Sequence, residues 1–105
     1  SLKNFILLNE EQNKFNSLIS YIVKNYTEEE IVSKIEQTAI DNYVPSNWEE
    51  DAKDEVEWYN KYGKGEAEDD VVTEIIQEAS KKKGIKLTNS QFADMQNWMY
   101  NTFSL

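Results

Sequence analysis

Apolar residues recur at helical spacing along most of the chain. The first stripe follows Asn9 and consists of Phe15, Leu18, Ile19, Ile22 and Val23. Spacings of three and four residues place side chains on one face of an α-helix, so we expect a first helix from Asn9 through this stripe. The short apolar run from Phe5 to Leu8 is the one candidate for a strand, at an edge.

A second helix is predicted from Thr27 to about Asn42. Thr27 and Glu30 have the spacing of a capping box, in which each side chain accepts a backbone N–H of the other. The apolar face of this helix consists of Ile31, Ile35 and Ala39. Pro45 cannot continue the helix, because its ring removes a backbone donor and clashes with the preceding turn.

A third helix is expected to begin at Ser46, which has Glu49 at capping-box spacing. Its inward residues would be Trp48, Ala52, Val56 and Tyr59. Gly63 and Gly65 predict a break after this helix, because glycine is a common helix terminator.

Two further helices complete the pattern. The fourth would carry acids in its first turn and present Val71, Val72, Ile75, Ile76 and Ala79 on one face. Three lysines and then Gly84 favour its end at that glycine, since cations and a C′ glycine both suit a helix C-terminus. Thr88 and Gln91 form another capping box, and the last stripe consists of Phe92, Met95, Met99 and Phe103.

The pattern therefore predicts an all-α fold, a small bundle of about five helices in a single domain over residues 1–105. A chain of this length forms one ordinary domain with a modest core. Trp98 and Tyr100 lie off the last stripe, so they are candidates for exposed aromatic residues.

The amino-acid composition excludes several kinds of catalytic and metal-binding site. The chain has 20 acids against 11 lysines, a net charge of −9, and contains no arginine, histidine or cysteine. These absences remove disulfides, thiolate nucleophiles and the usual transition-metal ligands, and no phosphate-binding or EF-hand loop is present. We expect no enzyme activity, no cofactor, no metal ion and no direct contact with nucleic acid. No apolar run approaches membrane-spanning length, so we expect no membrane contact and a cytoplasmic location.

Charge is concentrated between residues 48 and 70. This segment has ten acids and three lysines, a net charge of −7. The acids are Glu49, Glu50, Asp51, Asp54, Glu55, Glu57, Glu66, Glu68, Asp69 and Asp70. Trp58 and Tyr62 interrupt the run as candidate interface anchors. The segment is consistent with imitation of nucleic-acid phosphates, or with a solvated face that only keeps the protein soluble.

One stretch resembles a known family. Between Thr38 and Trp48 the pattern A-x-D-N-x-V-P ends one helix and precedes an aromatic, acidic segment. This resembles the Ocr-like phage proteins, acidic helical DNA mimics that occupy the DNA-binding site of restriction enzymes. The resemblance implies a structural corner at Asp41, Asn42, Val44 and Pro45. In size and charge the chain also resembles phage anti-CRISPR proteins. Residues 26–32 and 69–75 resemble helices of colicin-type immunity proteins.

The resulting hypothesis is an acidic inhibitor that blocks the nucleic-acid site of a defence nuclease in the host cytoplasm, with the ten acids, Trp58 and Tyr62 as the binding surface. Two alternatives remain open: an immunity-type nuclease inhibitor, and a scaffold that self-associates, as a homodimer for example, through the apolar face of its last helix around Trp98, Met99 and Phe103.

Overall fold

The described part of the chain is helical and contains no strand, which confirms the all-α prediction. The computed structural model describes residues 2–50 and 52–105, and the side chains of residues 12–50, 52–54, 56–61 and 63–105. In chain order the elements are α1 (Leu2–Asn25), α2 (Glu28–Asn42), the 3-10 turn η1 (Trp48–Glu50), α3 (Glu55–Trp58), the π-helical segment η2 (Tyr59–Gly63), α4 (Lys64–Lys83) and α5 (Asn89–Thr102).

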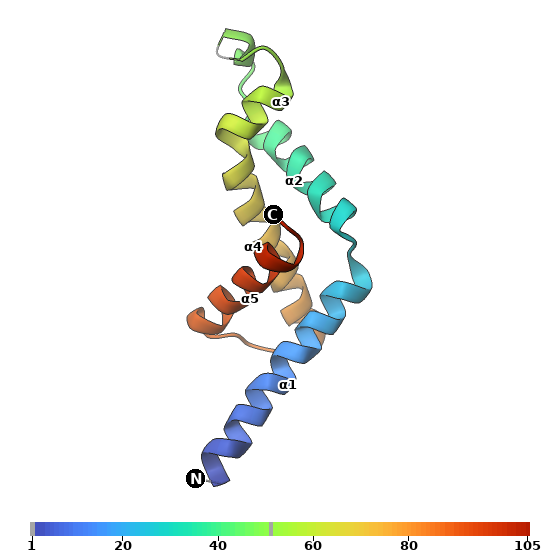
Figure 1. Ribbon diagram of the computed structural model, residues 1–105, viewed down its shortest axis with the longest axis vertical. Coiled ribbons are helices and arrows are strands. Elements are labelled where there is room, and N and C mark those ends of the chain that lie inside the picture. The colour runs from blue at the N-terminus through green and yellow to red at the C-terminus, as the bar shows by residue number, and fades with distance from the viewer. Residues whose placement is uncertain (1, 51) are drawn as a thin grey trace.

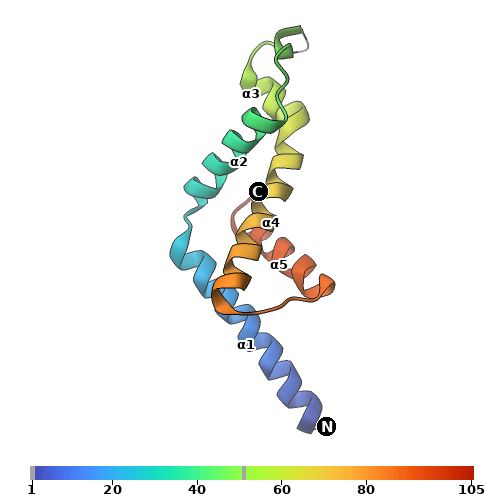
Figure 2. The same cartoon turned by 180° about the vertical axis from the view of Figure 1, so that it is seen from behind.

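Helix α4 is the centre of an elongated molecule whose Cα atoms extend over 62 × 23 × 21 Å. Helices α1, α2 and α5 all pack against it (Figure 1). The view from behind shows α2 and α4 as the two sides of a long arm that ends in η1 and α3 (Figure 2). The α5 helix covers α4 below this arm, close to where α1 crosses.

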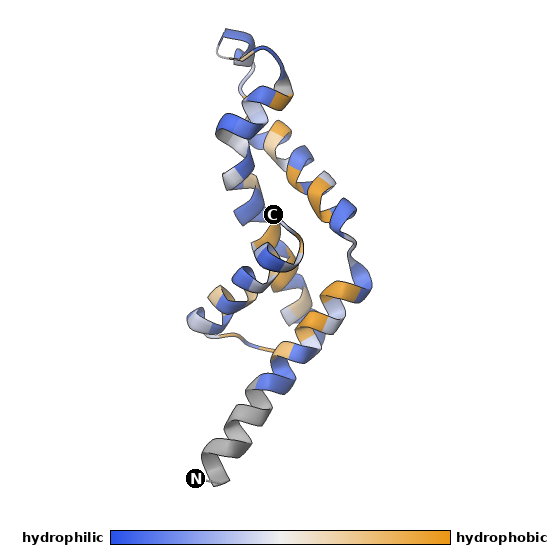
Figure 3. Ribbon diagram, viewed as in Figure 1, coloured by the Kyte–Doolittle hydropathy of each residue, from blue (hydrophilic) through white to orange (hydrophobic). Residues whose placement is uncertain are grey.

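The core follows the predicted stripes. Apolar faces of α1, α2, α4 and α5 turn toward one another, as the hydropathy colouring shows (Figure 3). Its buried members are Leu18, Ile22, Ile31, Ile35, Ala39, Ala67, Val71, Val72, Ile75, Ile76, Ala79, Met95, Met99 and Phe103. Six of them belong to α4, because that helix is contacted by α1, α2 and α5 and therefore buries a wide apolar face.

Three predicted helix ends are confirmed. The Thr27 hydroxyl accepts the Glu30 backbone N–H at 3.1 Å and caps α2. Thr88 and Gln91 form the complete reciprocal box at the start of α5. Gly84 ends α4 with φ of 64°, the left-handed conformation that glycine adopts without the steric penalty of a Cβ.

The third helix does not begin at Ser46, so this prediction is wrong. Residues 48–50 form only a 3-10 turn, and the helix starts at Glu55. The physical reason lies at Asp54, whose Oδ1 accepts the Glu57 backbone N–H at 2.8 Å. A carboxylate in this position satisfies a free donor of the first turn and fixes the helix start. Val56, predicted to face inward, is 66% exposed as a result.

The predicted break at Gly63 and Gly65 is also wrong, because helical structure continues from α3 through η2 into α4. Gly63 is buried where α4 meets α2: a Cβ built there would lie 3.2 Å from the Cβ of Ala39 and 3.4 Å from that of Tyr43. Glycine at this position therefore permits close helix contact. Gly65 has open space around it.

The strand expected for Phe5 to Leu8 is absent, since their backbone belongs to α1. A helix pairs its own backbone donors and acceptors, whereas a single strand would leave them without partners. Trp98 and Tyr100 are not free surface aromatics either: both pack against the core, and the Trp98 ring meets Phe103 edge-on at 5.8 Å. Since α5 crosses α4, side chains beside its main stripe are also covered.

Candidate partner-binding surface

The charge of the protein is strongly asymmetric. Residues 28–78 contain 17 acids and four lysines, a net charge of −13, so the remaining 54 residues carry +4. This acidic stretch runs from the start of α2 through the tip of the arm and down most of α4. The lysines at 81–83 and 86 follow at the opposite end of α4. The arm is therefore the acidic pole of the molecule.

A ridge of four acids runs along α4 at every fourth residue, with successive members about 6 Å apart along the axis. Its members are Glu66, Asp70, Glu74 and Glu78, all of them exposed. The ridge borders its neighbouring helices, and three of its members contact them. Tyr43 donates its hydroxyl to Asp70. Lys34 forms an ion pair with Glu74 at 3.3 Å.

The last member of the ridge, Glu78, accepts hydrogen bonds from two tyrosines. Tyr26 donates to one carboxylate oxygen, and Tyr21 approaches the other at 3.5 Å. Tyr100 of α5 donates in the same way to Asp69, the residue before the ridge member Asp70. The carboxylates of α4 thus hold α1, α2 and α5 through tyrosine hydroxyls.

These contacts raise the pKa values of the tyrosines. Burial raises the pKa of Tyr26 and Tyr100 well above 10, and the hydrogen bonds to Glu78 and Asp69 add to the effect. For Tyr43 the hydrogen bond to Asp70 is the main cause of a raised pKa. A phenol that donates to a carboxylate keeps its proton, so these tyrosines remain hydrogen-bond donors above the pH at which a free phenol ionises.

The acids predicted as site residues fall into two groups. Glu49, Glu50, Asp54 and Glu57 lie at the tip of the arm, and Glu66, Glu68, Asp69 and Asp70 lie on α4. The tip acids also serve local structure: Glu57 accepts the Lys53 backbone N–H at 2.9 Å. On α4, Glu68 is paired with Lys64 at 3.8 Å. Asp51 and the side chains of Glu55 and Tyr62 lie outside the described residues.

Trp58 is not the exposed anchor that the sequence suggested. Its side chain is 8% exposed, and its indole N–H donates to the Tyr43 backbone carbonyl at 3.3 Å. The reason is the late start of α3 at Glu55, which turns Trp58 toward the end of α2 and Val56 toward solvent. Trp58 therefore joins the two sides of the arm.

Sequence reasoning missed the acids of α2 and the lower part of the ridge. Glu28, Glu29, Glu30, Glu36 and Asp41 are exposed on α2, beside α4. Glu74 and Glu78 continue the ridge beyond the segment that was singled out. The ridge could have been predicted from the sequence, because acids at every fourth position between residues 66 and 78 form one row along a helix.

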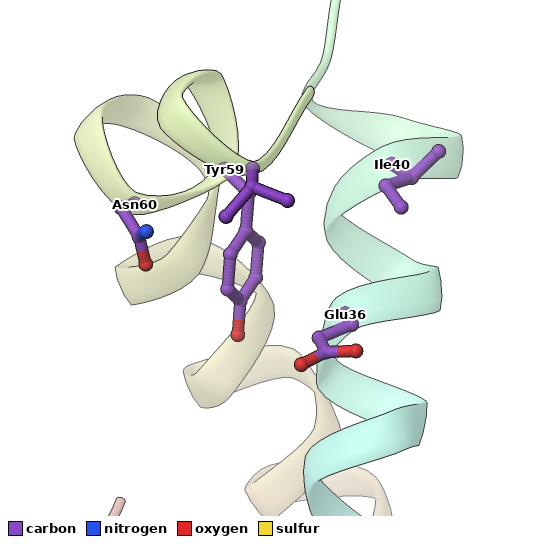
Figure 4. Close-up of a pocket in the computed structure, with 5 residues that line it drawn as sticks. Glu36, Ile40, Tyr59 and Asn60 are labelled. Atoms are coloured by element: carbon purple, nitrogen blue, oxygen red, sulfur yellow. The ribbon is translucent and has the colours of Figure 1, made fainter. Parts of the chain in front are cut away.

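A hollow lies between α2 and the α3–η2 segment. Its wall consists of Glu36, Ile40, Val56, Tyr59 and Asn60, and its volume is about 200 Å³. Tyr59 faces Ile40 and Glu36 across the gap (Figure 4). A second hollow adjoins it along α2, sharing Glu36, Tyr59 and Asn60. We call this pair the α2 groove.

The apolar face of the last helix is occupied within the molecule. Met99 is fully buried and Phe103 is 8% exposed, and Trp98 packs against them. Self-association through this face would therefore require the core to open, because its apolar groups already contact α4 and its neighbours.

Neither a metal centre nor a membrane helix is found in the part of the chain that the structure describes. No three acidic, histidine or cysteine side chains there come together as metal ligands would. Within the same residues no helix combines the length and apolar character needed to cross a membrane.

Comparisons with protein-family models, with curated proteins and with solved structures found no match for this chain.

Proposed function

We propose that this protein binds the cationic nucleic-acid site of another protein and blocks it by presenting carboxylates in place of phosphates. A defence nuclease of the restriction or CRISPR type is the target class that the sequence resemblances favour. The charge density of α4 is the observation that carries the proposal.

Between residues 66 and 78, α4 has six acids and no lysine. These 13 residues span about 20 Å of helix axis, so one negative charge occurs every ~3.3 Å. Phosphates along one strand of B-DNA occur every ~3.4 Å. The neighbouring α2 adds five acids against one lysine. A cationic groove built to hold a phosphate backbone would therefore meet a comparable linear charge on this arm.

The fold gives this charge a fixed position. Lys34 of α2, two tyrosines that flank α2 and one tyrosine of α5 hold the side chains of Asp69, Asp70, Glu74 and Glu78. Pre-positioned charge lowers the entropy lost on binding and steers association with an oppositely charged surface. The binding rate should consequently fall as ionic strength rises.

The test compares two variants with the same net charge in capture experiments from bacterial lysate, washed at low and at high salt. The ridge variant replaces three ridge acids and the adjacent Asp69, by Glu66→Gln, Asp69→Asn, Asp70→Asn and Glu74→Gln. Asparagine and glutamine retain an oxygen acceptor, so the tyrosine hydrogen bonds and the fold are preserved. The control variant carries Glu28→Gln, Glu29→Gln, Glu30→Gln and Asp94→Asn.

We expect the native chain and the control to capture a nucleic-acid-binding protein that salt or added DNA releases, and the ridge variant to lose this capture. Circular dichroism checks that both variants are folded. Undiminished capture by the ridge variant would refute phosphate imitation by α4. Equal losses in the two variants would show that net charge, and not this surface, determines binding.

A further inference from the structure

The α2 groove combines exposed apolar walls with the exposed carboxylate of Glu36. Val56 is 66% exposed and Ile40 is 37% exposed, although both are large apolar side chains. The ring of Tyr59 stands between Ile40 and Asn60 in Figure 4. No hydrogen bond or ion pair joins Glu36 to another described residue. Apolar surface and negative charge therefore lie exposed together at one place.

The electrostatic potential at Tyr59 in the groove is made negative by two carboxylates, those of Glu36 and Glu68. Burial raises the pKa of the Tyr59 hydroxyl, and the charges of Glu36 and Glu68 raise it further. The nearest lysine of the groove wall, Lys64, already pairs with Glu68 at 3.8 Å. A cation that entered the groove would thus find the Glu36 carboxylate available.

We infer that the groove between Ile40, Val56 and Tyr59 accepts an arginine side chain of the partner protein, with Glu36 as its counter-ion. The aliphatic part of arginine would cover Ile40 and Val56, and the planar guanidinium suits both an aromatic ring and a carboxylate. An uncharged apolar side chain would instead remove the Glu36 carboxylate from water without compensation. Lysine lacks the planar, multiply donating group.

This inference rests on the proposed function and makes its target surface more specific. Nucleic-acid-binding surfaces use arginine to grip phosphates and base edges. The ridge on α4 would meet the long-range charge of such a surface, and the groove would hold one of its side chains. The adjoining hollow continues along α2 to Leu105. The partner segment that carries this arginine would lie in that hollow.

The probe is N-acetyl-arginine methylamide, titrated into the intact protein and followed by NMR of its methyl and aromatic groups. We expect saturable shifts at Ile40, Val56 and Tyr59. The citrulline analogue has nearly the same shape without the charge and is expected to cause no saturable shift. Glu36→Gln should weaken binding of the arginine probe by about tenfold, the effect of losing one charge-assisted contact.

The matched control is Glu30→Gln, which removes the same charge from the same helix at a position outside the groove wall. It should leave the affinity for the probe unchanged. Equal responses to the arginine and citrulline probes, or equal effects of the two substitutions, would overturn the inference. Because the probe needs no target protein, binding in the groove without capture of any nucleic-acid-binding protein would refute the proposed function alone.

Discussion

Truncation of Trp58 to alanine is expected to destabilise the protein by about 3 kcal/mol. Large aromatic side chains bury roughly 150–250 Å², and this one is only 8% exposed. At about 25 cal/mol per Å² such burial corresponds to roughly 4–6 kcal/mol, and measured truncations cost about 3–5 kcal/mol. We expect the lower end, because the arm is thin around Trp58 and its neighbours can partly close the cavity.

Trp58→Phe separates packing from hydrogen bonding at the same position. Phenylalanine retains an aromatic ring but loses the indole N–H, which donates to the Tyr43 carbonyl at 3.3 Å. A hydrogen bond of this kind contributes about 1 kcal/mol. The smaller ring adds a modest loss of packing, so this variant should lie between the native protein and Trp58→Ala.

Urea unfolding followed by circular dichroism measures both changes. With a denaturant slope of about 1–3 kcal/mol per molar, the alanine variant should unfold at a midpoint roughly 1–3 M lower. Trp48→Ala is the control, since Trp48 is half-buried on the 3-10 turn and outside the core cluster, and its effect should be smaller. An unchanged midpoint for Trp58→Ala, together with lost partner binding, would instead identify Trp58 as an exposed anchor.

Two further predictions concern Gly63 and the tyrosines. Gly65→Ala should stabilise the protein by about 1 kcal/mol through helix propensity. Gly63→Ala should lose this gain, because its Cβ would lie 3.2 Å from the Cβ of Ala39 on α2. A thermal unfolding experiment in which Gly63→Ala is the more stable variant would contradict the close contact. Tyr26 and Tyr100 have raised pKa values, so their stabilising effect is complete below pH 10 and declines as pH rises above it. Spectroscopic titration should show phenolates that form later in the folded than in the urea-unfolded protein, and Tyr26→Phe and Tyr100→Phe should each remove one late step.

The sequence predicted the structure correctly where that structure depends on residues close together along the chain. Thr27 and Thr88 cap their helices and Gly84 ends α4 as expected, because each signal involves residues within one turn. The apolar stripes were also correct, since a helix that buries one face must repeat its apolar residues at helical spacing. Local chemistry therefore predicted four of the helical segments and most of the core.

Prediction failed where one local signal competed with another. Both Ser46 and Asp54 can cap a helix, and the structure uses Asp54. This choice changes the direction of the side chains in α3, because one residue corresponds to about 100° of rotation. Val56 and Trp58 consequently exchange their expected environments. Gly63 could not be distinguished from a helix terminator without knowledge that α2 lies against it.

For the candidate surface, the sequence predicted which segment is rich in acids but not which residues those acids contact. The density of acids up to residue 70 was evident, but the tyrosines that donate to Asp70 and Asp69 lie 27 and 31 residues away in sequence. The two tyrosines that donate to Glu78 lie 52 and 57 residues away. Sequence separations of this size depend on the tertiary fold. The same holds for the α2 groove, whose walls come from α2 and from the α3–η2 segment, which only the tertiary fold brings together.

Under the proposed function, the acids of α4 have two effects with opposite responses to salt. Their mutual repulsion along the arm opposes folding, and tyrosine hydroxyls and Lys34 offset part of it by holding Asp69, Asp70 and Glu74. Added salt screens the repulsion and should stabilise the free protein, while it weakens attraction to a cationic partner. An acidic face that only solubilised the protein would show the first effect without the second. The combination of both is what a charge-imitating surface requires.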